Sequence, residues 1–152
     1  MTRRTFLAAS AAASVAGAAP AKSSIGIATT SFSIRRPRDT YEFLELCHTF
    51  GAPGIQASLS SLEPAYLNKL KARASELGMY IEVMARLPKT EMGDFVQHVE
   101  AAGKVGALCI RAACLSGRRY ETFASLEDWK KFVSDSKAAL ARAVPIAEKY
   151  KV

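Results

Sequence analysis

The chain has 152 residues, of which 49% are hydrophobic, and its formal net charge is +7 at pH 7. This length and composition are typical of one globular domain. Residues 1–21 carry two of the 21 Lys and Arg residues, so without them 19 basic side chains face 14 acidic ones. The resulting net charge of +5 is too small to indicate a nucleic-acid partner by itself, and we predict none.

The first 21 residues have the features of an export signal. A charged start at Arg3-Arg4 precedes the apolar run 8–18 and the A-x-A cleavage pattern of 19–21. The apolar run is shorter than the roughly 20 residues of a membrane-spanning helix. The arginine pair resembles a twin-arginine signal. We therefore predict a twin-arginine-type signal peptide over 1–21, an exported, periplasmic bacterial product, and no membrane attachment after the signal is removed.

From residue 24 onward, short apolar segments alternate with segments of helical periodicity. The segment 24–29 predicts a first strand. Asp39 and Glu42 form a capping box that predicts the start of a helix, and Gly51 ends it. The second strand is predicted over 54–57. The apolar stripe of the helix is expected to consist of Tyr41, Leu44, Cys47 and Phe50.

The same alternation continues through residue 106. Ser61 is expected to open the second helix, with Pro64 in its first turn and Gly78 at its end. The third strand is predicted over 79–84, and a third helix runs to Gly106. The apolar positions expected in these two helices are Leu67, Leu70, Ala74 and Leu77, and then Phe95, Val99 and Ala102.

The last predicted elements are a fourth strand over 107–112 and a long helix. Ser125 and Asp128 form a second capping box at the start of this helix, and Pro145 is expected to kink it. Its apolar stripe is expected to consist of Trp129, Phe132, Val133, Leu140 and Val144.

These elements make one βα unit repeated four times. Short strands joined by helices require a parallel sheet, because the chain must return to the same end before each strand. Four units are half of a (β/α)8 TIM barrel. Residues 149–152 fall where a fifth unit would begin. We therefore predict an α/β fold in which 22–152 form the N-terminal half of a TIM barrel, truncated at the start of the fifth strand.

Several segments carry a resemblance to a known family. They are SIGIATTSF (24–32), FGAPGIQASLS (50–60), YIEVMARLP (80–88), GALCIRAACLSGRRYETFASLEDWKKF (106–132) and PIAEKYKV (145–152). Together they resemble the N-terminal half of the xylose isomerase-like TIM barrels, which are described as sugar phosphate isomerases/epimerases. The resemblance covers essentially all of residues 24–152.

The resemblance implies a metal-dependent activity on a small-molecule sugar or sugar derivative. In this family a divalent metal (Mn, Mg, Co or Zn) is held by a Glu, Asp, His, Glu set on the later strands. It polarises the carbonyl and hydroxyl groups of an open-chain sugar, and aldose and ketose, or ketose epimers, interconvert through an enediolate or a hydride shift. All four ligands are expected beyond Val152, so this fragment is expected to bind no metal and to be inactive alone.

Three of the predicted strands place a polar residue directly after an Ile. These residues are Gln56, Glu82 and Arg111. A polar side chain in a strand covered on both faces needs a partner. We predict that the three point into the barrel near its carboxyl mouth and bind substrate hydroxyl groups. The alternative is a structural ion pair between Glu82 and Arg111 on neighbouring strands.

Arginines also gather in the loops that follow the first and fourth strands. Loops at this end of a barrel carry function, and guanidinium groups suit carboxylates and phosphates. An anionic substrate is one interpretation, and solvated loop charge is the other. The residues are Arg35, Arg36, Arg38, Arg118 and Arg119.

The histidines and cysteines indicate no site. His48 and His98 fall inside helices on the outside of a barrel, so we expect them at the surface or in helix packing. The three cysteines form no CxxC pair, and we expect free thiols. Cys47 is expected in helical core, Cys109 in strand core and Cys114 in a loop.

Two other functions fit parts of the sequence. The first is an exported open α/β module of flavodoxin type that binds a ligand without chemistry, which would need protected sheet edges. The second is a relative of the apurinic-site endonucleases, whose zinc ligands include histidines of early strands, and the predicted strands contain none. A half barrel also leaves bare edges for a C-terminal half or for a homo-oligomer.

Overall fold

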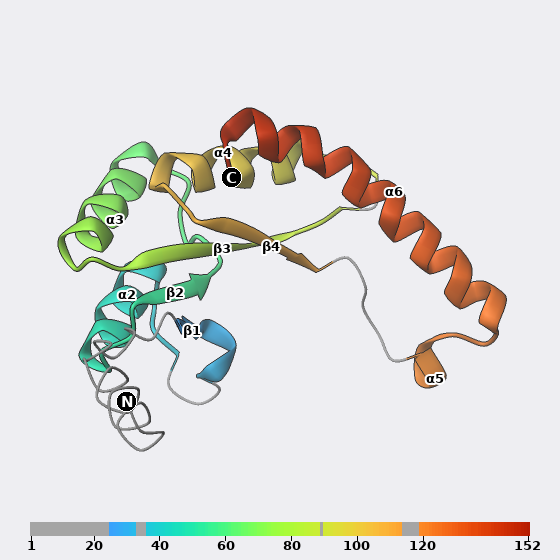
Figure 1. Ribbon diagram of the computed structural model, residues 1–152, viewed down its shortest axis with the longest axis horizontal. Helices are drawn as coiled ribbons and strands as arrows, with labels where there is room; N and C mark the ends of the chain where they lie inside the picture. The colour runs from blue at the N-terminus through green and yellow to red at the C-terminus, as the bar shows by residue number, and fades with distance from the viewer. Residues whose placement is uncertain (1–24, 33–35, 89, 114–118) are drawn as a thin grey trace, which may run out of the picture.

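The computed structural model describes residues 25–32, 36–88, 90–113 and 119–152. They form a four-stranded parallel sheet in the order β1-β2-β3-β4, with helices following the strands (Figure 1). The prediction of an α/β fold with parallel strands is therefore confirmed. The elements are β1 (Ile27–Ala28), the 3-10 turn η1 (Thr29–Ser31), α2 (Thr40–Thr49), β2 (Gly54–Ala57), α3 (Pro64–Glu76), β3 (Tyr80–Arg86), α4 (Gly93–Val105), β4 (Cys109–Ala113), α5 (Arg119–Thr122) and α6 (Leu126–Tyr150).

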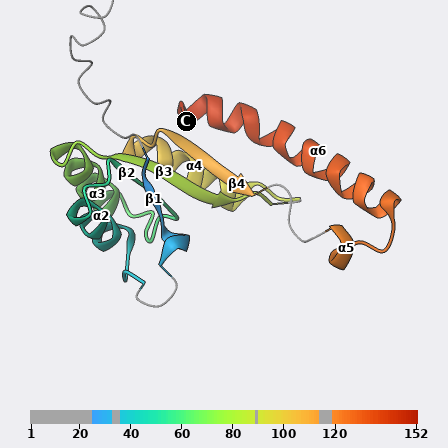
Figure 2. The same cartoon turned by 60° about the horizontal axis from the view of Figure 1, so that its bottom comes forward.

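The main core lies between one face of the sheet and the helices α2, α3 and α4. Alternate residues of β2 and β3 are buried against these helices, because successive side chains of a strand point to opposite faces. The buried set includes Ile55, Ala57, Ile81 and Val83 from the strands, and Phe43, Leu44, Leu67, Leu70, Ala102 and Val105 from the helices. The opposite face of the sheet is covered by none of the described helices (Figure 2).

Three strands differ from their predictions. The strand β4, predicted over 107–112, spans Cys109–Ala113. The strand β1 is limited to Ile27–Ala28, because the chain turns into η1 directly afterwards. The strand β3 continues to Arg86, two residues beyond its predicted end, because it stays paired with β4 as far as the Arg86–Ala113 step. The extension brings Arg86 into the sheet.

The capping residue predicted for α2 is correct, whereas the predicted start of α3 is not. The side chain of Asp39 accepts the backbone N–H of Glu42 at 2.8 Å, which confirms the cap of α2. The start of α3 was predicted too early. Its first residue is Pro64 and its N-cap is Glu63, while the hydroxyl of Ser61 accepts the N–H of Glu63 at 3.2 Å in the preceding loop.

The predicted apolar stripe of α2 is wrong at its last position. The helix ends at Thr49, and Phe50 is its C-cap with 61% of its surface exposed. The Phe50 ring stacks on Phe32 with the centroids 6.2 Å apart. The glycine endings are confirmed, because Gly51, Gly78 and Gly106 all have the left-handed φ that glycine adopts without strain.

The long helix α6 has its predicted cap, in which Ser125 Oγ accepts the N–H of Asp128 at 3.0 Å. Its predicted stripe is wrong at Leu140 and Val144, which are exposed, whereas Trp129, Phe132 and Val133 are half-buried. The buried positions of the helix are Ser136, Ala139 and Ala143. Pro145 lies inside the helix.

Small residues allow α6 to approach α4 closely. A Cβ on Gly103 of α4 would lie 2.7 Å from the carbonyl oxygen of Tyr150. Trp129 and Phe132 lie far from this contact and pack with Phe123, at centroid distances of 5.2 and 5.0 Å from its ring. None of the helices that the structure describes is both long and apolar enough to span a membrane.

Candidate functional site

The structure brings together the three polar residues that were predicted as a site. Gln56 lies opposite Glu82 in the register of β2 and β3, and its Nε2 donates to Glu82 Oε2 at 2.7 Å. Arg111 of β4 donates from Nη1 to Gln56 Oε1 at 3.0 Å. We call Gln56, Glu82 and Arg111 the polar row.

The polar row lies on the uncovered face of the sheet. The neighbours of Gln56 and Glu82 along β2 and β3 are buried on the helix side, so the two polar side chains point the other way. In β4, Ile110 and Ala112 pack against the core clusters, which places Arg111 on the same uncovered face.

The alternative ion pair between Glu82 and Arg111 is not formed in the structure. Arg111 lies opposite Met84, one step beyond Glu82 on this face. Its Nη1 passes the Met84 sulfur at 3.5 Å and reaches Gln56 two strands away. A hydrogen-bonded amide therefore connects the guanidinium and the carboxylate.

The hydrogen bonds of the polar row fix the orientation of the Gln56 amide. Its carbonyl must face the Arg111 donor and its NH2 group must face the Glu82 acceptor. Within the described residues, Glu82 Oε1 and the Nε and Nη2 atoms of Arg111 make no hydrogen bond. The row therefore presents an acceptor and several donors to a ligand that carries hydroxyl groups.

Tyr80 closes the amino end of the row, and the sequence predictions missed it. A Cβ on Gly54 would lie 2.5 Å from the Tyr80 ring, and one on Gly26 would lie 2.7 Å from the Tyr80 hydroxyl. The ring therefore lies across two neighbouring strands. A hollow of about 160 Å³ is lined by Tyr80 together with Gly26, Gln56 and Glu82. Gly54 at the start of β2 and Gly26 immediately before β1 were the available sequence signal for a ring above them.

A second hollow, of about 230 Å³, lies at the carboxyl ends of β1 and β2. Its lining includes Thr29, Thr30, Arg36 and Arg38. The guanidinium of Arg38 is paired with Glu42 at 3.3 Å. The Arg38 backbone N–H and guanidinium hold the pKa of Glu42 below its usual value. Of the other predicted loop arginines, Arg35, Arg118 and the side chain of Arg119 lie outside the described residues, as do residues 1–24 and Cys114.

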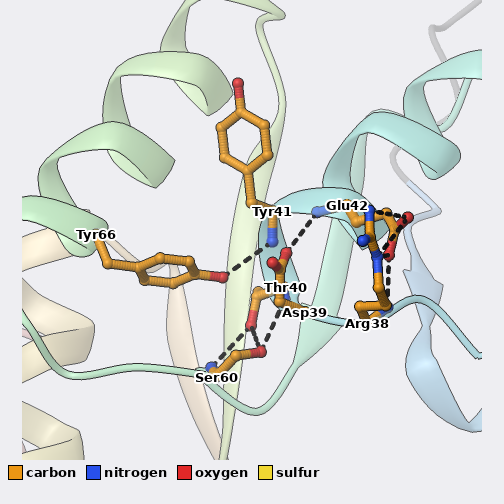
Figure 3. Close-up of polar contacts among 7 residues, drawn as sticks. All are labelled: Arg38, Asp39, Thr40, Tyr41, Glu42, Ser60 and Tyr66. Carbon is orange, nitrogen blue, oxygen red and sulfur yellow. Dashed lines mark hydrogen bonds and ion pairs between the residues drawn. The ribbon is translucent and has the colours of Figure 1, made fainter.

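The N-terminus of α2 borders this second hollow, but its N–H groups are already bound (Figure 3). The N–H of Thr40 donates to Ser60 Oγ at 2.8 Å, and the N–H of Tyr41 donates to the Tyr66 hydroxyl at 3.1 Å. The next N–H, of Glu42, is taken by the Asp39 cap. This helix end therefore offers none of the first three N–H groups that bind anions at other helix N-termini.

Arg86 is a further residue that the sequence predictions missed. Arg86 lies four residues after Glu82 in β3, and residues an even number of positions apart in a strand point to the same face. Its side chain is exposed. It was missed because β3 was predicted to end at residue 84.

None of the cysteines and histidines that the structure describes belongs to a group of three or more residues that could hold a metal. Cys47 is buried as predicted, and burial raises its pKa to about 11. Cys109 was predicted in the core but is exposed, because it lies on the uncovered face of the last described strand. Partial desolvation of the thiol by its neighbours in the sheet, together with the nearby charge of Glu82, raises the pKa of Cys109. His48 is exposed and His98 Nδ1 lies 2.8 Å from the Asp94 carbonyl oxygen, both on helices.

Comparisons of the chain with protein-family models, with curated proteins and with solved structures give no match.

Proposed function

We propose that this chain forms the N-terminal half of a xylose isomerase-like TIM barrel and supplies part of the sugar site of a metal-dependent isomerase or epimerase. The polar row on the uncovered face carries the proposal. The strands follow one another in sequence order, and α2, α3 and α4 cover one face. Parallel sheets have both faces covered, and in a barrel the second face is the interior. A doubly wound flavodoxin-type sheet reverses its strand order and has helices on both faces, so the observed order does not favour that alternative.

The polar row has the chemistry to bind and orient an open-chain sugar. Glu82 Oε1 can accept a hydrogen bond from a hydroxyl group, and Arg111 can donate hydrogen bonds to a hydroxyl or carbonyl oxygen. Gln56 holds both side chains through its fixed amide. Tyr80 limits how far a ligand extends toward the amino ends of the strands.

The metal implied by the family would polarise the carbonyl and hydroxyl groups of the sugar. The residues that the structure describes do not fit such an ion by themselves, because they contain no group of three or more His, Cys, Asp and Glu that could hold a metal. Glu82 is the single carboxylate of the polar row. The role proposed for this chain is therefore binding and orientation.

Titration calorimetry with an acyclic pentitol tests the role of the polar row. We expect the full chain to bind the pentitol and Glu82→Gln to weaken binding roughly tenfold, the typical loss for one hydrogen bond to a charged group. Glu76→Gln is the matched control, because Glu76 is exposed on α3 and lies outside the row. Absence of pentitol binding, or equal weakening in both variants, would contradict the proposal.

We also propose that the protein is exported to the bacterial periplasm through residues 1–21. The twin-arginine pattern supports this. N-terminal sequencing of the protein recovered from periplasm should begin near residue 22. Replacement of both Arg3 and Arg4 by Lys should retain the protein in the cytoplasm, and unchanged export would count against a twin-arginine route.

A further inference from the structure

Two arginines, Arg86 and Arg111, project from the uncovered face in the carboxyl-terminal parts of β3 and β4. Arg111 pairs in register with Met84, and Arg86 pairs with Ala113 one step farther along the same face. Neighbouring parallel strands lie about 4.8 Å apart and residues two positions apart along a strand are about 6.6 Å apart. The two arginines are thus diagonal neighbours whose long side chains can meet at one ligand.

Neither guanidinium is neutralised by a described carboxylate. By contrast, Arg38 is paired with Glu42 at the start of α2, and Arg73 of α3 is paired with Glu45 of α2. Arg86 and Arg111 are exposed and form no ion pair among the residues that the structure describes. The strands of the uncovered face carry these two positive charges and the negative charge of Glu82, which leaves an excess of one positive charge.

The charged residues of the uncovered face follow one another along the direction of the strands. Glu82 lies toward the amino ends of the strands, Arg111 lies one step farther, and Arg86 lies at the carboxyl end of β3. The carboxylate that accepts hydrogen bonds from neutral hydroxyl groups therefore lies toward the amino ends of the strands. The cationic donors lie toward the carboxyl ends, which form the rim of this face. A ligand that complements this face has hydroxyl groups at one end and an anion at the other.

We propose that the ligand of the polar row is a sugar acid, whose hydroxyl-bearing carbons lie along Gln56 and Glu82 and whose carboxylate is bound by Arg86 and Arg111. This inference rests on the proposed sugar-binding role of the row. A carboxylate suits the face for two reasons. It carries one negative charge, equal to the excess positive charge, and its planar pair of oxygens matches the fork of a guanidinium.

Calorimetric titration of the full chain with three ligands of equal carbon number tests the proposal. The ligands are a five-carbon aldonate, the neutral pentitol and a pentitol phosphate. We expect the aldonate to bind roughly tenfold more tightly than the pentitol, as is typical of added hydrogen bonds between charged groups. Arg86→Gln should reduce aldonate affinity to that of the pentitol and leave the pentitol unaffected, whereas Arg86→Lys should retain part of the preference.

Arg38→Gln is the matched control, because Arg38 lies at the same end of the sheet but is already paired with Glu42. It should leave the preference for aldonate unchanged, and circular dichroism should show that both variants fold.

Failure of the sugar-acid proposal and failure of the proposed sugar-binding role give different titration results. Equal affinity for aldonate and pentitol, with both lost in Glu82→Gln, would overturn the sugar acid and leave the proposed function in place. Tighter binding of the phosphate than of the aldonate would overturn the choice of carboxylate. Equal effects of Arg38→Gln and Arg86→Gln would overturn the assignment to this face. Binding of none of the three ligands would overturn both proposals.

Discussion

At the scale of single residues, the Tyr80 ring imposes a strict size limit on the strand beside it. A Cβ on Gly54 would lie 2.5 Å from ring atoms of Tyr80, whereas a Cβ on Gly93 would meet no atom within 4 Å. We expect Gly54→Ala to destabilise the fold by about 1–3 kcal/mol through overpacking. Gly93→Ala should be neutral or stabilise it by up to about 1 kcal/mol, because Gly93 starts α4.

Urea denaturation measures both glycine variants. In a Tyr80→Ala background the cost of Gly54→Ala should fall, because the clashing ring is gone. An equal cost with and without the ring would show that Tyr80 is not its cause.

A second prediction at this scale concerns the hydroxyl of Thr40, which is buried at the start of α2. Thr40 Oγ1 donates to the Ser58 carbonyl at 2.8 Å and accepts the Ser60 N–H at 3.0 Å. Thr40→Val preserves the side-chain shape but leaves these backbone groups without a partner, so we expect a loss of about 1–3 kcal/mol in unfolding free energy.

Thr49→Val is the matched control for Thr40→Val. Thr49 lies on the same helix, and its exposed hydroxyl donates to the Leu46 carbonyl at 2.7 Å, which water can replace. Its effect should stay within about 0.5 kcal/mol. Equal shifts in the urea midpoints of the two variants would contradict a specific role for the loop contact.

At the scale of elements, α2 and α3 are joined by a carboxylate–guanidinium pair. Arg73 Nη2 donates to Glu45 Oε2 at 3.0 Å, and Arg73 also contacts Glu76. The hydrogen bonds from Arg73 hold the pKa of Glu45 below its usual value. Since the folded pKa is lower than the unfolded one, the pair stabilises the fold above the ordinary Glu pKa of about 4.3 and loses this effect as the pH falls through the folded value.

We expect Arg73→Met to raise the pKa of Glu45 toward its usual value and to make unfolding free energy less dependent on pH in the acid range. Carboxyl NMR titration measures the pKa. Lys104→Met is the control, because Lys104 pairs with Glu100 inside α4 and holds the pKa of Glu100 below its usual value. It should raise the pKa of Glu100 and leave Glu45 unchanged. An unaltered Glu45 titration in Arg73→Met would contradict the prediction.

At the scale of the whole molecule, the described sheet ends in two strands that have a neighbour on one side only. These are β1 and β4, and the exposed Leu108 immediately precedes β4. Unpaired strand edges promote association between chains. We therefore expect the average mass in sedimentation velocity to rise with protein concentration.

Leu108→Lys should reduce this association, because a charge next to a strand edge opposes pairing. Leu126→Lys is the control, since Leu126 is also exposed but starts α6 far from this edge (Figure 1). A constant monomer mass at all concentrations, or equal effects of the two variants, would contradict the role of the edge.

The regular alternation of the sequence determined the order and type of the main elements. Hydrophobic period and glycine endings are local properties, so they predicted the strands, the helices between them and the shared direction of Gln56, Glu82 and Arg111. The caps at Asp39 and Ser125 were predictable for the same reason, because a capping side chain binds within one helical turn.

Tertiary contacts decided what local patterns could not. Two apolar stripes are available on α6, and the close approach at Gly103 selects the alanine stripe over Leu140 and Val144. The pairing with β4 decides that β3 continues to Arg86, and the position of Arg111 opposite Met84 decides that it binds Gln56 and not Glu82. Register and helix approach depend on residues far apart in the chain, so the polar row's hydrogen bonds and the Arg86–Arg111 rim became visible only in the folded sheet.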